Sequence, residues 1–413
     1  MIFSKSINEL NIDDIRIFCE KGIKEGFTLD YKEDFPNNLE KTICAFANTF
    51  GGVILLGVEE NQEGKPIMPI KGIDFERGLH ERVVNIILDN IYPPLFPEIE
   101  VVRFQDNGND KAVVVIRIPQ SDMTPHLIDN KRKVYIRTDN RNKPEEVATI
   151  DQIEWLYNKR KKSEELKQTL YDNAVKRVKD IYNAPNLWVR DQKFKTSKVQ
   201  GIFSAIPLFP SRSFTNVKEL KKLCSSELKV KDYCWYPDFF PEALDLKTTQ
   251  YSVLNYHHKE NRRGIVFSEF NIYGLFIYQE PLLEQYKDTD IFVVQTYGIL
   301  AHLDQFIEVV ERFYNKIGVW GLIEMGFVIN DAFGLNMSTE NNFKPSDSFV
   351  CHQDTVDIKR ILDKRELRDR RLEILKDIFK EICLAFNFDM LDEFIQEYLS
   401  ENKGYALKRE ENL

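Results

Sequence analysis

Three acidic residues and one lysine near the N-terminus have the types and spacing that phosphoryl chemistry requires: Glu25, Asp30, Lys32 and Glu59. Mg²⁺ prefers carboxylate oxygens and water, and one or two carboxylates are enough to hold it beside a phosphate. A divalent ion there would polarise the phosphoryl oxygen and activate a water, while Lys32 would offset the charge that develops on the phosphate. We therefore interpret all four as candidate catalytic residues, with Glu25, Asp30 and Glu59 as ligands of Mg²⁺ or Mn²⁺. Because the chain has 66 acidic residues, ordinary surface acids are the competing interpretation.

The elements that would position these residues are two short strands and the helix between them. Over residues 27–32, apolar side chains alternate with polar ones, which is typical of a half-buried strand and places Asp30 and Lys32 on one face. The continuous apolar run of residues 53–58 predicts a strand covered on both faces, and Glu59 follows it. Since an intervening helix would make these strands neighbours, we expect the acids to converge.

Two helix starts are predicted from capping patterns. Asn11 is followed three residues later by Asp14, and Asn37 is followed three residues later by Glu40, so each pair fits a capping box. Further alternating or continuous apolar runs predict strands at residues 98–104, 112–118 and 134–138. The N-terminal part is therefore predicted to be one α+β domain, a mixed sheet with flanking helices.

Six basic residues gather on or beside the last of these strands and form a candidate nucleic-acid-binding stripe: Lys131, Arg132, Lys133, Arg137, Arg141 and Lys143. Lysine and arginine side chains in such a row can follow a phosphate backbone. The density of the row within a chain of net charge −9 favours binding over a merely solvated surface. The same net charge argues against coating of nucleic acid through bulk electrostatics.

Three segments are predicted along the chain. They are the mixed-sheet domain at residues 1–150, a charged helical connector at residues 151–188, and a second α+β domain at residues 189–413 that serves sensing or oligomerisation. Late in the chain, residues 358–386 are predicted to form one long charged helix with an apolar seam. The fold class of the whole chain is therefore α+β.

Cysteine spacing and hydropathy indicate in which cellular compartment the protein is expected. The six cysteines lack C-x-x-C spacing, so neither a zinc site nor a disulfide framework is predicted. The N-terminus has no basic start followed by a continuous apolar stretch, and no later run reaches the ~18 apolar residues of a membrane span. We therefore expect a cytoplasmic protein with no membrane partner.

Two linked motifs resemble a known family. The pattern E-x-x-x-x-D-Y-K at residues 25–32 is followed by ICAFANTFGGVILLGVEE at residues 43–60. Together they resemble the Schlafen AlbA_2 family, and TPH at residues 124–126 with VYIRTDNRNKP at residues 134–144 is similar to the family's closing segment. The resemblance covers residues 10–150 and leaves the C-terminal half uncovered.

The resemblance implies two alternative functions. In eukaryotic Schlafen proteins, acids spaced like Glu25 and Asp30, with a third after the second strand, form a metal-dependent ribonuclease site that acts on transfer and ribosomal RNA. This implies a homo-oligomeric nuclease of structured, tRNA-like RNA in anti-phage defence, with RNA expected rather than DNA. Many bacterial members are described as DNA-binding regulators, which implies the alternative of a non-catalytic transcriptional regulator with a C-terminal effector-binding domain.

The sequence departs from the family pattern at two positions. Asp30 stands where Glu is typical, and Glu59 stands where Asp is typical. The charge is retained, but the reach of each side chain changes by one methylene. Such a change could retune or abolish catalysis, or preserve it if the two changes compensate. The zinc cluster of eukaryotic members has no counterpart in this sequence.

Overall fold

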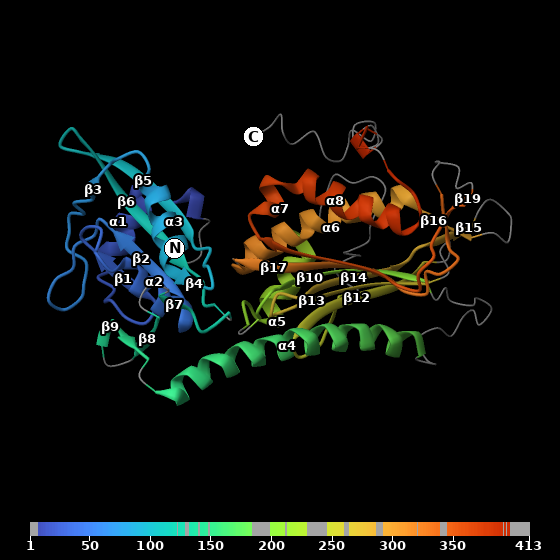
Figure 1. Cartoon of the computed structure of the whole chain (residues 1–413), viewed down its shortest axis with the longest axis horizontal. Helices are drawn as coiled ribbons and strands as arrows, with labels where there is room; N and C mark the ends of the chain where they lie inside the picture. The colour runs from blue at the N-terminus through green and yellow to red at the C-terminus, as the bar shows by residue number, and fades with distance from the viewer. Residues whose placement is uncertain are drawn as a thin grey trace. The chain divides into compact units, whose positions relative to one another are not determined.

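The computed structural model divides the chain into two compact units, Met1–Glu165 and Leu166–Leu413 (Figure 1). Both units combine helices and strands, which confirms the predicted α+β class. The structure describes residues 7–121, 123–128, 132–138, 141–147, 149–183, 199–210, 213–228, 246–259, 264–285, 292–319, 321–338, 345–390, 392–393 and 395–396.

Among its described residues, the N-terminal unit contains two sheets and the helical elements η1 (a 3₁₀ turn, Ile7–Glu9), α1 (Ile12–Glu20), α2 (Leu39–Asn48) and α3 (Leu79–Asn90). The long helix α4 (Ile150–Asn183) begins in this unit and continues into the C-terminal unit. The strands of the N-terminal unit are β1 (Leu29–Lys32), β2 (Gly52–Leu56), β3 (Ile73–Asp74), β4 (Ile91–Tyr92), β5 (Glu98–Asp106), β6 (Asn109–Ile118), β7 (Leu127–Ile128), β8 (Lys133–Thr138) and β9 (Arg141–Glu146).

The larger sheet places β1 at its edge, next to β2. The two strands run parallel, with Asp30 opposite Ile54, as expected for strands joined by a helix. The order continues through β6 to β3, and β5 also pairs with β6. Ile54 packs against α2 and α3 on one face, whereas Val53 packs against α1 on the other. The apolar run was therefore correctly predicted to be covered on both faces.

The smaller sheet has the order β4, β7, β8, β9 and shares its core with α2. Tyr135 of β8 and Ile128 of β7 lie in the same apolar cluster as Phe46 of α2. This packing holds β8 over the face of α2, and β8 carries Arg137.

The two predicted capping boxes have different outcomes. At α1, the side chain of Asn11 accepts a hydrogen bond from the backbone of Asp14, and the Asp14 carboxylate accepts one from the backbone of Asn11, so the capping box is confirmed. At α2 the prediction is wrong: Asn38 is the N-cap residue, and its side chain makes no capping hydrogen bond. Glu40 is buried instead of solvated at the helix start.

The C-terminal unit is built on a seven-stranded sheet with the order β11-β12-β13-β14-β10-β17-β20, in which all neighbours are antiparallel. These strands are β10 (Gln200–Pro207), β11 (Lys247–Thr248), β12 (Ser252–Lys259), β13 (Gly264–Asn271), β14 (Phe276–Pro281), β17 (Leu322–Ile329) and β20 (Val356–Asp363). A four-stranded sheet follows the order β15 (Leu283–Gln285), β16 (Phe292–Gln295), β18 (Asn336–Ser338) and β19 (Pro345–Val350). The helical elements are α5 (Val217–Lys222), η2 (Leu223–Glu227), α6 (Thr296–Ile317), α7 (Glu366–Asp369) and α8 (Arg371–Ala385).

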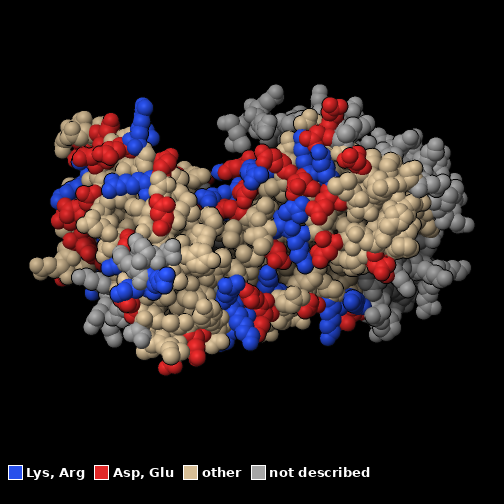
Figure 2. Space-filling model, in the orientation of Figure 1, with Lys and Arg blue, Asp and Glu red and all other residues tan. Residues whose placement is uncertain are grey.

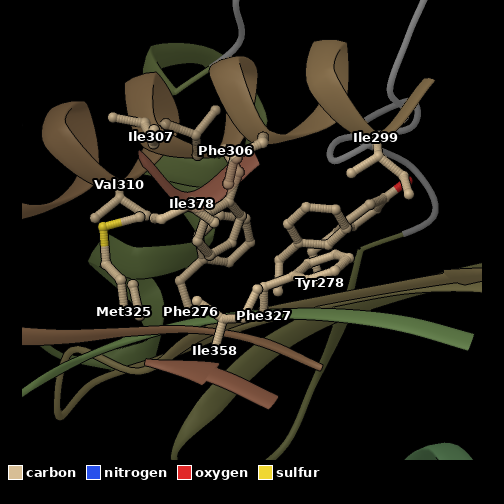
Figure 3. Close-up of a cluster of buried hydrophobic side chains, with 14 of the residues drawn as sticks. Phe276, Tyr278, Ile299, Phe306, Ile307, Val310, Met325, Phe327, Ile358 and Ile378 are labelled. Atoms are coloured by element: carbon tan, nitrogen blue, oxygen red, sulfur yellow. The ribbon is translucent and has the colours of Figure 1, made fainter. Parts of the chain in front are cut away.

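Helices cover both faces of the seven-stranded sheet. On one face an aromatic core joins the sheet to α6 and α8, and Phe276 of β14 stacks on Phe306 of α6 with ring centroids 4.7 Å apart (Figure 3). The opposite face packs against Leu170, Ala174 and Val178 of α4. The charged helix predicted from Ile150 onward is therefore confirmed.

The single helix predicted over residues 358–386 is wrong. The structure has the strand β20 first and the helix α8 only from Arg371. Val356 and Ile358 are buried while Asp357 and Lys359 are exposed, which is strand periodicity. The apolar residues of the strand happened to continue the helical spacing of α8.

None of the described helices combines the length and the apolar character that crossing a membrane requires.

Candidate active site

Three of the four predicted catalytic residues converge at the edge strand β1. Glu25 lies in the turn before β1, and its Oε1 accepts a hydrogen bond from the backbone amide of Tyr31 at 2.6 Å. The Lys32 Nζ lies 3.6 Å from the same Glu25 oxygen and also forms an ion pair with Asp30 Oδ1. Asp30 and Glu25 are themselves linked through a side-chain hydrogen bond. The structure therefore forms a carboxyl pair with one ammonium group beside it.

Arg137 of β8 completes this cluster from a distant part of the sequence. Its Nη2 lies 2.5 Å from Asp30 Oδ2, and the two side chains are 1% and 2% exposed. Both oxygens of Asp30 thus have a cationic partner, Lys32 on one and Arg137 on the other. The Lys32 side chain is 27% exposed, so the cluster meets solvent at this lysine.

The pKa of the Asp30 carboxyl group is raised above its ordinary value. Burial, followed by the hydrogen bond with Glu25, raises its pKa, and with the opposing positive charges of Lys32 and Arg137 included the pKa is about 7. The Asp30 carboxyl group can therefore hold or release a proton near neutral pH.

Glu59 does not take part in these contacts. It lies just after β2, as predicted, but its carboxylate is paired with Lys71, whose Nζ also lies 3.5 Å from Glu33. The Glu59 side chain is 29% exposed. Among the described residues, no group of three or more acidic, cysteine or histidine side chains is arranged to hold a metal ion.

The donor set at β1 can be compared with what a divalent ion needs. Glu25 and Asp30 provide carboxylate oxygens that converge on the position of the Lys32 ammonium, which itself is a cation. Mg²⁺ is commonly held by one or two carboxylates together with substrate phosphate oxygens and water. Glu25 and Asp30 would supply the two carboxylates of such a site, and Lys32 would be available to a bound phosphate.

The six residues of the predicted nucleic-acid-binding stripe have different environments. Arg132 is exposed in a turn with φ of 49°, and Lys133 is exposed and paired with Glu146 at 2.8 Å. Arg137 points into the domain. Arg141 and Lys143 lie on β9, and Lys131 lies outside the described residues. Figure 2 shows lysine and arginine side chains interspersed with acidic ones on the visible face.

Asn48, at the end of α2, links the segments around His126 and Tyr135 through hydrogen bonds. Its amide nitrogen donates to the carbonyl oxygens of His126 at 2.9 Å and Tyr135 at 2.8 Å, and its oxygen accepts from the backbone amide of His126 at 2.7 Å. The buried His126 ring is held by Pro93 O and Ser121 Oγ. Burial lowers the pKa of His126 to about 4, so this side chain is neutral and serves the structure.

The structure also contains site residues that the sequence patterns did not indicate. Lys71, the partner of Glu59, lies in a loop without periodicity. For Arg137, the sequence contains one weak indication that it faces the core and not the solvent. Arg137 and Tyr135 are two residues apart on one strand, so their side chains lie on the same face, and an aromatic residue on that face favours the core.

Fold and site together define an α+β domain with an acid pair on the edge strand of a mixed sheet and a closing hairpin behind it. Residues 25–146 match the family model described as Schlafen, AlbA_2, which agrees with the resemblance noted from the sequence motifs. The match supports a function related to nucleic acid.

Two solved structures resemble part of the chain. One is the N-terminal domain of a RecG-related protein from Nitrosomonas europaea, with 18% identity and a TM-score of 0.25, covering 34% of this chain and 96% of that one. The other is the DIP2311 protein from Corynebacterium diphtheriae, with 15% identity and a TM-score of 0.23, covering 35% of this chain and 27% of that one. Neither TM-score supports a further conclusion. No curated protein matches the chain.

Proposed function

We propose that the N-terminal unit binds structured nucleic acid, RNA in preference to DNA, and cleaves its phosphodiester backbone in the presence of Mg²⁺ or Mn²⁺. The observation that carries the proposal is the convergence of Glu25, Asp30 and Lys32 at one sheet edge. The Schlafen AlbA_2 match over the same residues supports it. The C-terminal unit would restrain the nuclease through sensing or through homo-oligomer formation, in keeping with a role in anti-phage defence.

Each side chain has a distinct role in this mechanism. Glu25 and Asp30 would hold the divalent ion, which when bound supplies polarisation of the phosphoryl oxygen. Lys32 reaches solvent and would contact the scissile phosphate, offsetting negative charge in the transition state. Because the pKa of Asp30 is about 7, the acid pair can accept or donate a proton at physiological pH.

A second function is favoured by a specific observation. Both oxygens of Asp30 already have cationic partners, so a structural role would explain the buried acid without any metal. In that case the domain would bind duplex DNA as a transcriptional regulator, and the C-terminal unit would bind an effector. The two functions differ in whether the backbone is cut.

The deciding experiment is incubation of the full chain with transfer RNA, with and without Mn²⁺. The double variant Glu25→Gln plus Asp30→Asn is expected to lose about 100-fold in cleavage rate, because it removes the metal-binding charge while preserving shape. The matched control is Glu63→Gln, an exposed acid paired with Lys65, which should cleave like the unmodified chain. If the unmodified chain gives no metal-dependent product but binds DNA with steep salt dependence, the regulator is correct.

A further inference from the structure

Arg137 lies where a nucleic-acid backbone cannot reach it. It is on β8, the strand that begins at the exposed Lys133, but its own side chain is 1% exposed. Its guanidinium group contacts Asp30, a residue 107 positions earlier in the chain. Side chains that bind phosphate must be accessible to it, and Arg137 is not.

The guanidinium group of Arg137 packs against an aromatic ring of α2. The central carbon of the Arg137 guanidinium lies 4.4 Å from the ring centroid of Phe46, which is fully buried. Arginine stacks well on aromatic faces, and the stacking leaves the edge of the fork free to bind a carboxylate. Phe46 therefore directs the fork toward Asp30.

The strand that carries Arg137 is fixed by the same helix. Asn48 lies two residues after Phe46 on α2 and donates a 2.8 Å hydrogen bond to the carbonyl of Tyr135. Tyr135 precedes Arg137 by two residues on β8, so both side chains leave the strand on the same face. Helix α2 thus sets both the position of β8 and the plane of the guanidinium.

Arg137 restricts the orientation of the Asp30 carboxyl group. With Oδ2 bound to Arg137, the carboxyl group cannot rotate freely, and Oδ1 is left facing the ammonium group of Lys32. The same ammonium group lies 3.6 Å from Glu25 Oε1, so this orientation keeps the two carboxyl groups around one cation.

We propose that Arg137 is a positioning residue that orients Asp30 within the Glu25–Asp30 pair, and not a contact to phosphate. The inference rests on the proposed function of that pair. It predicts that the arginine acts on the turnover step and leaves the affinity for nucleic acid unchanged.

The test compares Arg137→Met and Arg137→Lys in the full chain. The matched control is Arg103→Met, because Arg103 also lies over a phenylalanine ring, Phe75, at 3.9 Å and is not among the partners of Asp30. Two readouts are followed: kcat and KM for metal-dependent RNA cleavage, and the side-chain conformation of Asp30 in crystal structures of the variants and of the unmodified chain.

In Arg137→Met the Asp30 carboxyl group should turn away from Lys32, and kcat should fall by about tenfold or more with KM unchanged. Arg137→Lys retains the charge but not the planar fork, so it should also lower kcat about tenfold with KM unchanged. The control should change neither readout.

The proposal is overturned if Arg137→Met leaves the Asp30 side chain in its original conformation and instead raises KM several-fold. If the unmodified chain cleaves nothing, the proposed function fails, and the crystal structure of Arg137→Met still decides the role of Arg137: a rotated Asp30 carboxyl group supports it and an unchanged one overturns it. If Arg137→Met does not fold, Arg137→Lys decides, since a loss in kcat supports positioning and a rise in KM alone supports phosphate contact.

Discussion

In the N-terminal unit Arg137 binds one member of a hydrogen-bonded acid pair, whereas in the C-terminal unit Arg371 lies between two acids. The Arg371 guanidinium is 2.7 Å from Asp304 Oδ1 and 3.2 Å from Glu308 Oε2. Asp304 and Glu308 lie one turn apart on α6, and Arg371 begins α8. The acids of both clusters are almost completely buried.

The two clusters differ in whether the cation of the ion pair can be replaced by another binding partner. Arg371 of α8 pairs with two acids of α6, and both helices pack on the aromatic core, so its ion pairs hold α8 to α6. At β1 the acids come from one strand and the turn before it, and Lys32 reaches solvent. A buried ion pair between helices favours one arrangement, while an acid pair beside an exposed ammonium can change its partner when substrate binds.

The largest effect is expected from breaking the interhelical cluster. Arg371→Met would leave Asp304 and Glu308 without this partner, and loss of one side of a buried ion pair costs about 3 kcal/mol or more. Urea unfolding of the full chain should therefore show a large loss of stability. Arg368→Met is the control, because its pair with Asp369 is exposed on both sides. Equal stability of the two variants would contradict the comparison.

A smaller effect is expected from the pH dependence of stability. The pKa of Asp30 is raised from 3.8 to about 7 in the folded chain, so the folded state holds a proton that the unfolded state releases. Its contribution to stability is therefore present at low pH and is lost as pH rises through this window. His126 acts oppositely, because its pKa is lowered from 6.5 to about 4 and its contribution is lost as pH falls. The two effects partly cancel between pH 4 and 6.5.

The cancellation is removed by a difference measurement. The free energy of unfolding of the unmodified chain minus that of Asp30→Asn isolates Asp30, and this difference should decline as pH rises toward 7, at up to about 1.4 kcal/mol per pH unit. Denaturant unfolding at each pH provides the values. A difference that increases with pH would show that Asp30 is a conventionally ionised, stabilising carboxylate, as in an ordinary structural ion pair.

The sequence predicted the parts of the site that depend on local pattern. Strand alternation placed Asp30 and Lys32 on one face, and the capping pair Asn11–Asp14 located the start of α1. The contact between Asp30 and Arg137 could not be predicted, because the two residues are 107 positions apart and local patterns do not show which distant strand packs next to β1. At residues 358–386 the apolar residues of the strand β20 have a spacing that also fits the helix α8, so the periodicity alone predicted one continuous helix.

The smallest expected effect concerns Glu59, the third acid of the predicted site. Its pairing with Lys71 places its charge outside the contacts of the Glu25–Asp30 pair, so Glu59→Gln should reduce metal-dependent cleavage by less than about tenfold, against about 100-fold for the double variant at Glu25 and Asp30. The comparison is made at saturating Mn²⁺ and again at limiting Mn²⁺. A loss equal to that of the double variant would mean that Glu59 leaves Lys71 and joins the pair when metal binds, so that the site uses three acids.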